Sequence, residues 1–80
     1  MLKREKKPCL VLTFDTTAAA MGAEAACAAA GIPGRLLPVP RQLSSDCGIA
    51  WASDTDQRPA LEALLAQGKL EPAGIYELLL

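Results

Sequence analysis

The sequence predicts a small α+β domain with the element order β-α-β-β-α-β. Three observations lead to this prediction. Short apolar runs rich in β-forming residues alternate with two longer segments of helical pattern. A glycine follows each helical segment, and prolines or polar residues separate the other elements. The chain has 80 residues, of which 51% are hydrophobic, so it has room for one core.

The first strand is predicted over residues 9–14, Cys-Leu-Val-Leu-Thr-Phe. This run follows a proline, is almost continuously apolar and stops at Asp15, a pattern typical of a strand buried on both faces. Residues 1–8 are rich in lysine and arginine and are expected to form a disordered basic tail. A single domain is therefore expected over residues 9–80.

The first helix is predicted over the alanine-rich residues 18–30. Asp15, Thr16 and Thr17 precede it and are residue types that cap helix N-termini, while Gly31 provides the stop. Its small side chains allow the helix to lie close to a sheet.

An edge strand is predicted next, over residues 35–40. Pro38 and Pro40 cannot donate hydrogen bonds, so this segment does not fit the centre of a sheet. Residues 41–48 follow as a polar loop, and residues 49–52 are apolar enough for a buried strand.

The second helix is predicted to start after Ser53, with Asp54 or Thr55 as its cap, and to end at Gly68. Alanine and leucine recur within it at helical spacing, at positions 60, 61, 64 and 65. Residues 69–74 turn the chain, and residues 75–80 form the last strand.

With right-handed crossovers, this order gives a four-stranded antiparallel sheet of order 4-1-3-2 with two helices on one face, the ferredoxin-like arrangement. The proline-rich strand then lies at an edge, as its composition requires. The other sheet face has no helix, and the last strand is more apolar than a solvated strand. We therefore expect a homodimer through this face or its edge.

Composition excludes several classes of function. The chain has no histidine and one each of Trp, Tyr and Phe, which excludes a Ser-His-Asp or Cys-His site, a histidine-bound metal and an aromatic platform for bases. Residues 1–7 carry a charge of +3 and the rest −4, so the domain lacks a basic face for nucleic acid. No segment approaches the roughly 20 apolar residues that cross a bilayer.

The three cysteines have different settings. Their odd number and wide spacing argue against a disulfide framework, a metal centre or a bound cofactor, and favour reduced thiols in the cytoplasm. Cys9 starts a strand and Cys27 lies in a helix, so both are expected to be packing thiols. Cys47 lies in the polar loop before Gly48 and is either an incidental turn cysteine or a reactive one.

The predicted topology brings this loop to the same end of the sheet as the start of the first helix. The N–H groups there, near Thr16 and Thr17, favour an anion, and Arg41 adds a positive charge. Asp46 acts in the opposite direction, because a carboxylate disfavours a thiolate beside it. Ser44, Ser45 and Gly48 complete the candidate site, although serines in pairs often only bond turn backbone and a glycine often only permits an unusual backbone angle.

The segment Pro-Val-Pro-Arg at 38–41, followed by Ser-Ser-x-Cys-Gly at 44–48, resembles a family of small bacterial proteins described as selenium/sulfur carrier-like. The resemblance runs from about residue 10 to 76 and includes Phe-Asp-Thr-Thr at 14–17 and Gly-Ile at 31–32. It implies that Cys47 is the carrier thiol, with Arg41, Ser44, Ser45 and Gly48 as its setting. The alanine-rich first helix and the other two cysteines depart from the family pattern.

Three hypotheses follow. In the first, a carrier and not a turnover enzyme, Cys47 accepts sulfur or selenium from a donor enzyme such as a cysteine desulfurase, holds it as a persulfide or selenosulfide, and passes it to an acceptor enzyme. In the alternative, a non-catalytic module binds a small anion or a protein through the same loop and helix start. In the third, the chain is a structural subunit that pairs through its sheet.

Overall fold

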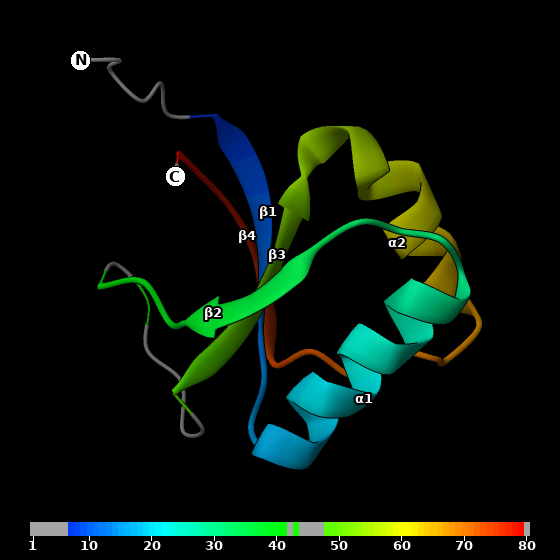
Figure 1. Ribbon diagram of the computed structural model, residues 1–80, viewed down its shortest axis with the longest axis horizontal. Coiled ribbons are helices and arrows are strands. Elements are labelled where there is room, and N and C mark those ends of the chain that lie inside the picture. Colours follow the sequence, from blue (N-terminus) through cyan, green and yellow to red (C-terminus); the bar gives the residue numbers. More distant parts are fainter. Residues whose placement is uncertain (1–6, 42, 44–47, 80) are drawn as a thin grey trace.

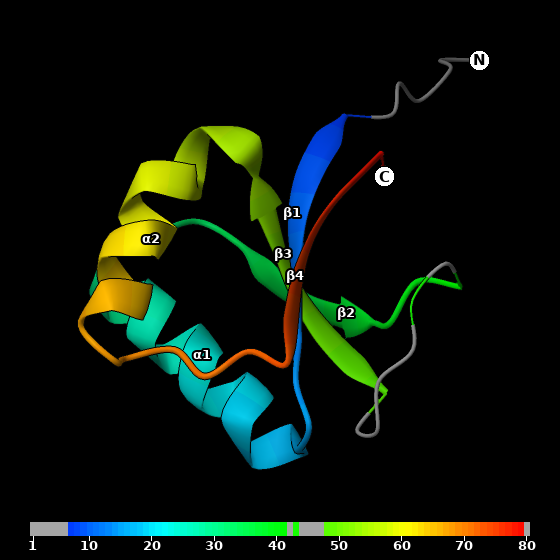
Figure 2. The same ribbon diagram turned by 180° about the vertical axis from the view of Figure 1, so that it is seen from behind.

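The computed structural model describes residues 7–41, 43 and 48–79, and in these the predicted ferredoxin-like fold is confirmed. The sheet order is β2-β3-β1-β4, with every neighbouring pair antiparallel. Both helices cover the same face of the sheet (Figures 1 and 2). The elements in chain order are β1 (Pro8–Thr13), α1 (Thr17–Ala29), β2 (Arg35–Pro38), β3 (Ile49–Asp54), a 3-10 turn η1 (Thr55–Gln57), α2 (Arg58–Ala66) and β4 (Gly74–Leu79).

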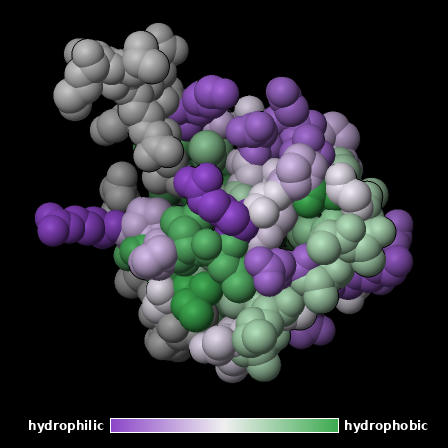
Figure 3. Space-filling view, viewed as in Figure 1, coloured by the Kyte–Doolittle hydropathy of each residue, from purple (hydrophilic) through white to green (hydrophobic). Residues whose placement is uncertain are grey.

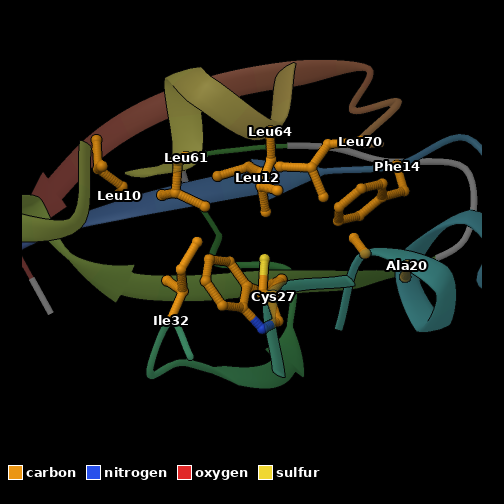
Figure 4. Close-up of a cluster of buried hydrophobic side chains, with 11 residues drawn as sticks. Leu10, Leu12, Phe14, Ala20, Cys27, Ile32, Leu61, Leu64 and Leu70 are labelled. Atoms are coloured by element: carbon orange, nitrogen blue, oxygen red, sulfur yellow. The ribbon is translucent and has the colours of Figure 1, made fainter. Parts of the chain in front are cut away.

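β1 is the central strand, paired with β3 on one side and β4 on the other. Its side chains alternate between the two faces of the sheet, as expected for a strand buried on both. Leu10 and Leu12 belong to the core under the helices, as does Phe14 just beyond the strand, whereas Val11 belongs to a second cluster on the other face. Figure 4 shows the helix-side core, in which Leu10 and Leu12 lie near Leu61 and Leu64, and Phe14 lies beside Leu70 and Ala20.

α1 has the predicted signals at both ends. Thr16 is the N-cap, and its side-chain oxygen accepts a hydrogen bond from the backbone N–H of Ala19 at 3.1 Å. At the other end Gly31 has a φ of 74°, and the N–H of Ile32 donates to the carbonyl of Cys27 at 2.9 Å. This is the Schellman arrangement that a glycine after a helix permits. The outer surface of α1 is mostly alanine, seen as pale green in Figure 3.

α2 begins later than predicted, at Arg58 and not directly after Asp54 or Thr55. Asp54 precedes the 3-10 turn and makes no side-chain cap bond. Pro59 explains the difference, because a proline has no N–H and its ring clashes with the carbonyl four residues earlier. An α-helix started at Thr55 would have Pro59 in its second turn, whereas a helix started at Arg58 has it in the first turn, where proline is tolerated.

β2 lies at a sheet edge, as its prolines predict, and the chain entering it passes close to Trp51. Trp51 is 1% exposed and is the largest fully buried side chain. A Cβ atom on Gly34 would lie only 2.6 Å from Cε2 of this indole. The absence of a side chain at position 34 is therefore what allows the backbone and the indole to pack together.

The sheet face without helices is not bare at its centre, contrary to the expectation of an uncovered face. Val11, Ala50 and Ala52 are 0%, 0% and 6% exposed on this side. The residues packed against them are Leu37, Val39, Leu43 and Leu78. Val39 and Leu43 come from the segment that follows β2, and Leu43 lies beyond the strand predicted over residues 35–40.

Replacing Gly34 with alanine is expected to destabilise the fold by about 1–3 kcal/mol, because the new methyl group overlaps the Trp51 indole. For a domain of this size the Tm is expected to fall by roughly 4–24 °C, measurable by calorimetry. Gly22→Ala is the matched control. Gly22 lies in α1, and a Cβ atom added there would have nothing within 4 Å, so this change raises the Tm or leaves it unchanged. An unaltered Tm in Gly34→Ala would show that the close approach does not constrain the fold.

Removing the N-cap of α1 by Thr16→Ala is expected to cost about 1 kcal/mol, because the N–H of Ala19 loses its side-chain acceptor. Chemical denaturation measures the loss as a lower midpoint at constant slope. Thr17→Ala is the control, since Thr17 is the exposed first residue of the helix and is not the cap. Equal losses in the two variants would contradict the assignment of Thr16 as the cap.

Candidate functional site

The structure describes only some of the residues of the candidate site. Arg41, Gly48, Thr16 and Thr17 are described, whereas Ser44, Ser45 and Cys47 lie outside the described residues, as do residues 1–6 of the predicted tail. The geometry of the site is therefore that of its two boundaries, Arg41 and Gly48, and of the start of α1.

Both ends of the β2–β3 connection are fixed by backbone hydrogen bonds. The N–H of Val39 donates to the carbonyl of Gly48 at 3.1 Å, which extends the β2–β3 pairing by one step beyond Pro38 and Ile49. The N–H of Leu43 donates to the carbonyl of Pro40 at 2.9 Å. The first bond ties Gly48 to the β2 side of the sheet, and the second closes a turn that contains Arg41.

Gly48 and Arg41 are both exposed at these boundaries. Gly48 has a φ of 72°, in the left-handed region where a side chain is strained, and a Cβ atom added to it would have nothing within 4 Å. The glycine is thus required by the backbone angle and not by a crowded neighbour. Of the two roles that the sequence left open for Gly48, this geometry favours the unusual backbone angle.

The start of α1 lies at the same end of the sheet as Gly48. Thr13, the last residue of β1, pairs with Ala50, which is two residues after Gly48. The chain then passes through Phe14 and Asp15 to the cap residue Thr16 (Figures 1 and 2). The positive end of the α1 dipole and the boundary of the polar loop therefore share one edge of the domain, as the predicted topology required.

Cys27 is a packing thiol, as predicted. It lies in α1, is 1% exposed and points into the helix-side core cluster (Figure 4). Burial raises the pKa of its thiol above the usual value, because a thiolate is poorly solvated there. A buried, protonated thiol is neither a good nucleophile nor a good metal ligand.

Cys9 is not buried as a packing thiol would be, which corrects the sequence interpretation. It is half-exposed, and its thiol lies 3.5 Å from the carbonyl oxygen of Lys7, which accepts from it. The physical reason is the strand alternation: Cys9 shares a face with Val11 and not with Leu10, and no helix covers that face. The alternation of positions along the strand can be read from the sequence. It is the signal that could have distinguished the exposed Cys9 from the buried Cys27.

An open hollow of about 260 Å³ adjoins Cys9, at the end of the sheet away from Gly48. Arg35 and Asp54 line it, with Pro33, Gly34, Ala52 and Ser53. Cys9 pairs with Asp54, the last residue of β3, whereas Gly48 precedes its first residue, Ile49. Five residue steps of β3 separate these two ends, about 16 Å. The two regions are therefore distinct.

Neither metal binding nor a membrane span emerges from the described residues. Among residues 7–41, 43 and 48–79, no three Cys, Asp or Glu side chains gather as the ligands of a metal ion would. In that same part of the chain, no helix has the length and apolar character needed to cross a membrane.

The burial of the thiols predicts their reactivity toward iodoacetamide. In a Cys47→Ser background, Cys9 is expected to be alkylated in the folded protein, whereas Cys27 reacts only after unfolding in denaturant. Peptide mass spectrometry at successive times distinguishes the two sites. Alkylation of Cys27 at the rate of Cys9 in the folded state would contradict its place in the core.

Comparisons with known proteins add one result to this geometry. No curated protein and no solved structure matches the chain significantly. A family model does match, over residues 9–77, and this range extends from β1 into β4 and includes the whole β2–β3 connection. Since the match covers nearly the entire chain, the protein belongs to the family described as Putative Se/S carrier protein-like.

Proposed function

We propose that this protein carries a single sulfur or selenium atom on the thiol of Cys47, as a persulfide or selenosulfide. The observation that carries the proposal is the family match, which spans the fold and the loop in which this cysteine stands. The sequence supports it further, since Cys47 lies in a polar loop and the chain has no histidine for other common thiol chemistry. The protein is proposed to act between a donor enzyme, such as a cysteine desulfurase, and an acceptor enzyme.

The loading step needs only a thiolate. The Cys47 sulfur attacks the outer sulfur of the donor's persulfide, a new S–S bond forms, and the donor's own S–S bond breaks to release its cysteine as a thiolate. Delivery is the same reaction with the acceptor thiol as the attacking group. The zero-valent sulfur moves without net oxidation, and no metal or cofactor takes part.

The setting of the loop supports this chemistry electrostatically. A persulfide is more acidic than a thiol, so the loaded carrier bears a negative charge near its outer atom. Arg41 at one boundary of the loop and the start of α1 at the same sheet end both favour a negative charge. Gly48 permits the turn back into β3 with its carbonyl bonded to Val39.

The other two thiols support a carrier with one working cysteine. Cys27 is enclosed in the core with a raised pKa. Cys9 is accessible but lies at the far end of β3 from Ile49, about 16 Å along the strand. A disulfide requires Cα atoms within about 7 Å, and the separation of Cys9 from Ile49 is more than twice that distance. This separation favours transfer to a second protein over displacement of the cargo by Cys9.

Intact mass spectrometry tests the proposal directly. After incubation with a cysteine desulfurase and cysteine, or with a selenium donor, the wild-type chain is expected to gain the mass of one sulfur or one selenium atom. Cys47→Ser is expected to lose this gain completely, because the accepting thiol is absent. Cys9→Ser is the matched control and should load as the wild type does.

Two outcomes contradict the carrier proposal. One is a wild-type chain that never gains the atom, and the other is an adduct that persists in Cys47→Ser. Arg41→Ala separates the carrier from the alternative, a non-catalytic module for a small anion or a protein. A carrier with this substitution loads more slowly but to the same final extent. A binding module loses its ligand in Arg41→Ala and keeps it in Cys47→Ser.

A further inference from the structure

The two edges of the sheet differ in how well they are protected against pairing with another strand. An edge strand exposes unpaired backbone groups, and proteins commonly block such edges with proline, charge or a covering segment. β2 has this protection. Pro38 stands within it, Arg35 starts it, and the following segment folds back so that Val39 and Leu43 pack against the sheet.

β4, the opposite edge, has almost none of these features. Gly74–Leu79 has no proline and one charged residue, Glu77. Ile75, Tyr76 and Leu79 are 42%, 41% and 60% exposed, which places them among the most exposed large apolar side chains of the described chain. Figure 2 shows β4 at the front of the sheet with β1 behind it, and among the described strands none pairs with the other side of β4. A strand of this kind is typical of a pairing surface.

The face of the sheet is a weaker candidate than this edge. Its central residues, Val11 and Ala50, are already fully buried within the chain. The exposed apolar area is thus concentrated on β4 itself. Of the two surfaces that the sequence left open for a homodimer, the sheet face and the sheet edge, this distribution favours the edge.

The edge of an antiparallel strand is complementary to itself under a two-fold rotation, so a second copy of the chain is a natural occupant. The single charge then restricts the register. A pair centred on Glu77 would place two carboxylates directly opposite one another, which is unfavourable. Centring the pair on Tyr76 separates them and places two aromatic rings together. We propose that β4 pairs antiparallel with β4 of a second copy, with the two-fold axis at Tyr76.

The local geometry is consistent with this register. The ring of Tyr76 lies over Gly74, since a Cβ there would lie 2.8 Å from its Cε2 atom. In the dimer Gly74 faces Leu78 of the second copy, so the ring gains an apolar neighbour. Glu77 faces Ile75 of the second copy and keeps its contact with Arg58 of its own chain, at 3.4 Å.

The pairing is independent of the proposed carrier function, because β2 and β3 are separated from β4 by the width of β1. Gly48, the described residue that leads into β3, thus lies across β1 from the paired strand. A failure of sulfur loading therefore leaves this inference standing, and a monomeric protein leaves the carrier proposal standing.

The mass in solution provides the first test. Light scattering over micromolar concentrations is expected to give twice the 8.4 kDa of one chain. Tyr76→Lys removes the aromatic pair and brings two positive charges together, so the dissociation constant is expected to rise roughly tenfold or more. Met21→Lys is the control, since Met21 is 59% exposed on α1 and away from β4. Circular dichroism verifies that both variants fold.

A monomer at all these concentrations would overturn the proposal. So would a dimer that Tyr76→Lys leaves intact, because association would then use another surface. Equal weakening by Tyr76→Lys and Met21→Lys would also count against it, as a general effect of charge.

Disulfide trapping tests the register. In a Cys9→Ser, Cys47→Ser background, Tyr76→Cys places two cysteines opposite one another at the axis, and mild oxidation is expected to link the copies. Ile75→Cys is the matched control. Its two cysteines are offset by two residues along the strands and lie about 8 Å apart, beyond the reach of a disulfide. Linkage through position 75 and not 76 would refute the proposed register.

Discussion

The burial of β1 on both faces and its pairing on both sides is the constraint on which the rest of the structure depends. Leu10 and Leu12 give the helices a surface to cover, and Val11 gives the other face its own small core. Because β1 pairs with β3 and β4 at once, it fixes their registers against each other. It also determines where α1 starts, and so which end of the sheet receives both the α1 N-terminus and the polar loop.

The sequence predicted the fold well wherever local chemistry decides the structure. Pro38 placed β2 at an edge, and Gly31 and Gly68 ended the helices at the observed positions. The predicted start of α2 was wrong because it was based on the capping residue types Asp54 and Thr55. Pro59 restricts the backbone more strongly than these residues do, and it moves the start to Arg58. The packing of Leu43 against the sheet was not predictable, since this residue lies beyond the predicted strand and its place depends on contacts between distant segments.

The candidate site shows the same division. Topology predicted correctly that the start of α1 and the boundary of the loop share one end of the sheet. The sequence interpretation treated Cys9 and Cys27 alike as packing thiols, because it did not consider which face of the sheet the helices cover. Cys27 is enclosed by α1 and the core, whereas Cys9 lies on a face that no helix covers. The structure thus distinguishes Cys9 from Cys27 by their burial, which the number and spacing of the cysteines do not reveal.

The contact between Gly34 and Trp51 has a practical consequence for studying this protein. Trp51 is the single tryptophan of the chain, and it is enclosed on the helix side of the sheet. Its fluorescence therefore comes from one defined apolar environment, and a red shift of the emission reports entry of water into the core. No described residue of β4 belongs to that core cluster, so changes in this strand leave the signal in place. The fluorescence of Trp51 can therefore show whether an inactive variant has also lost its fold.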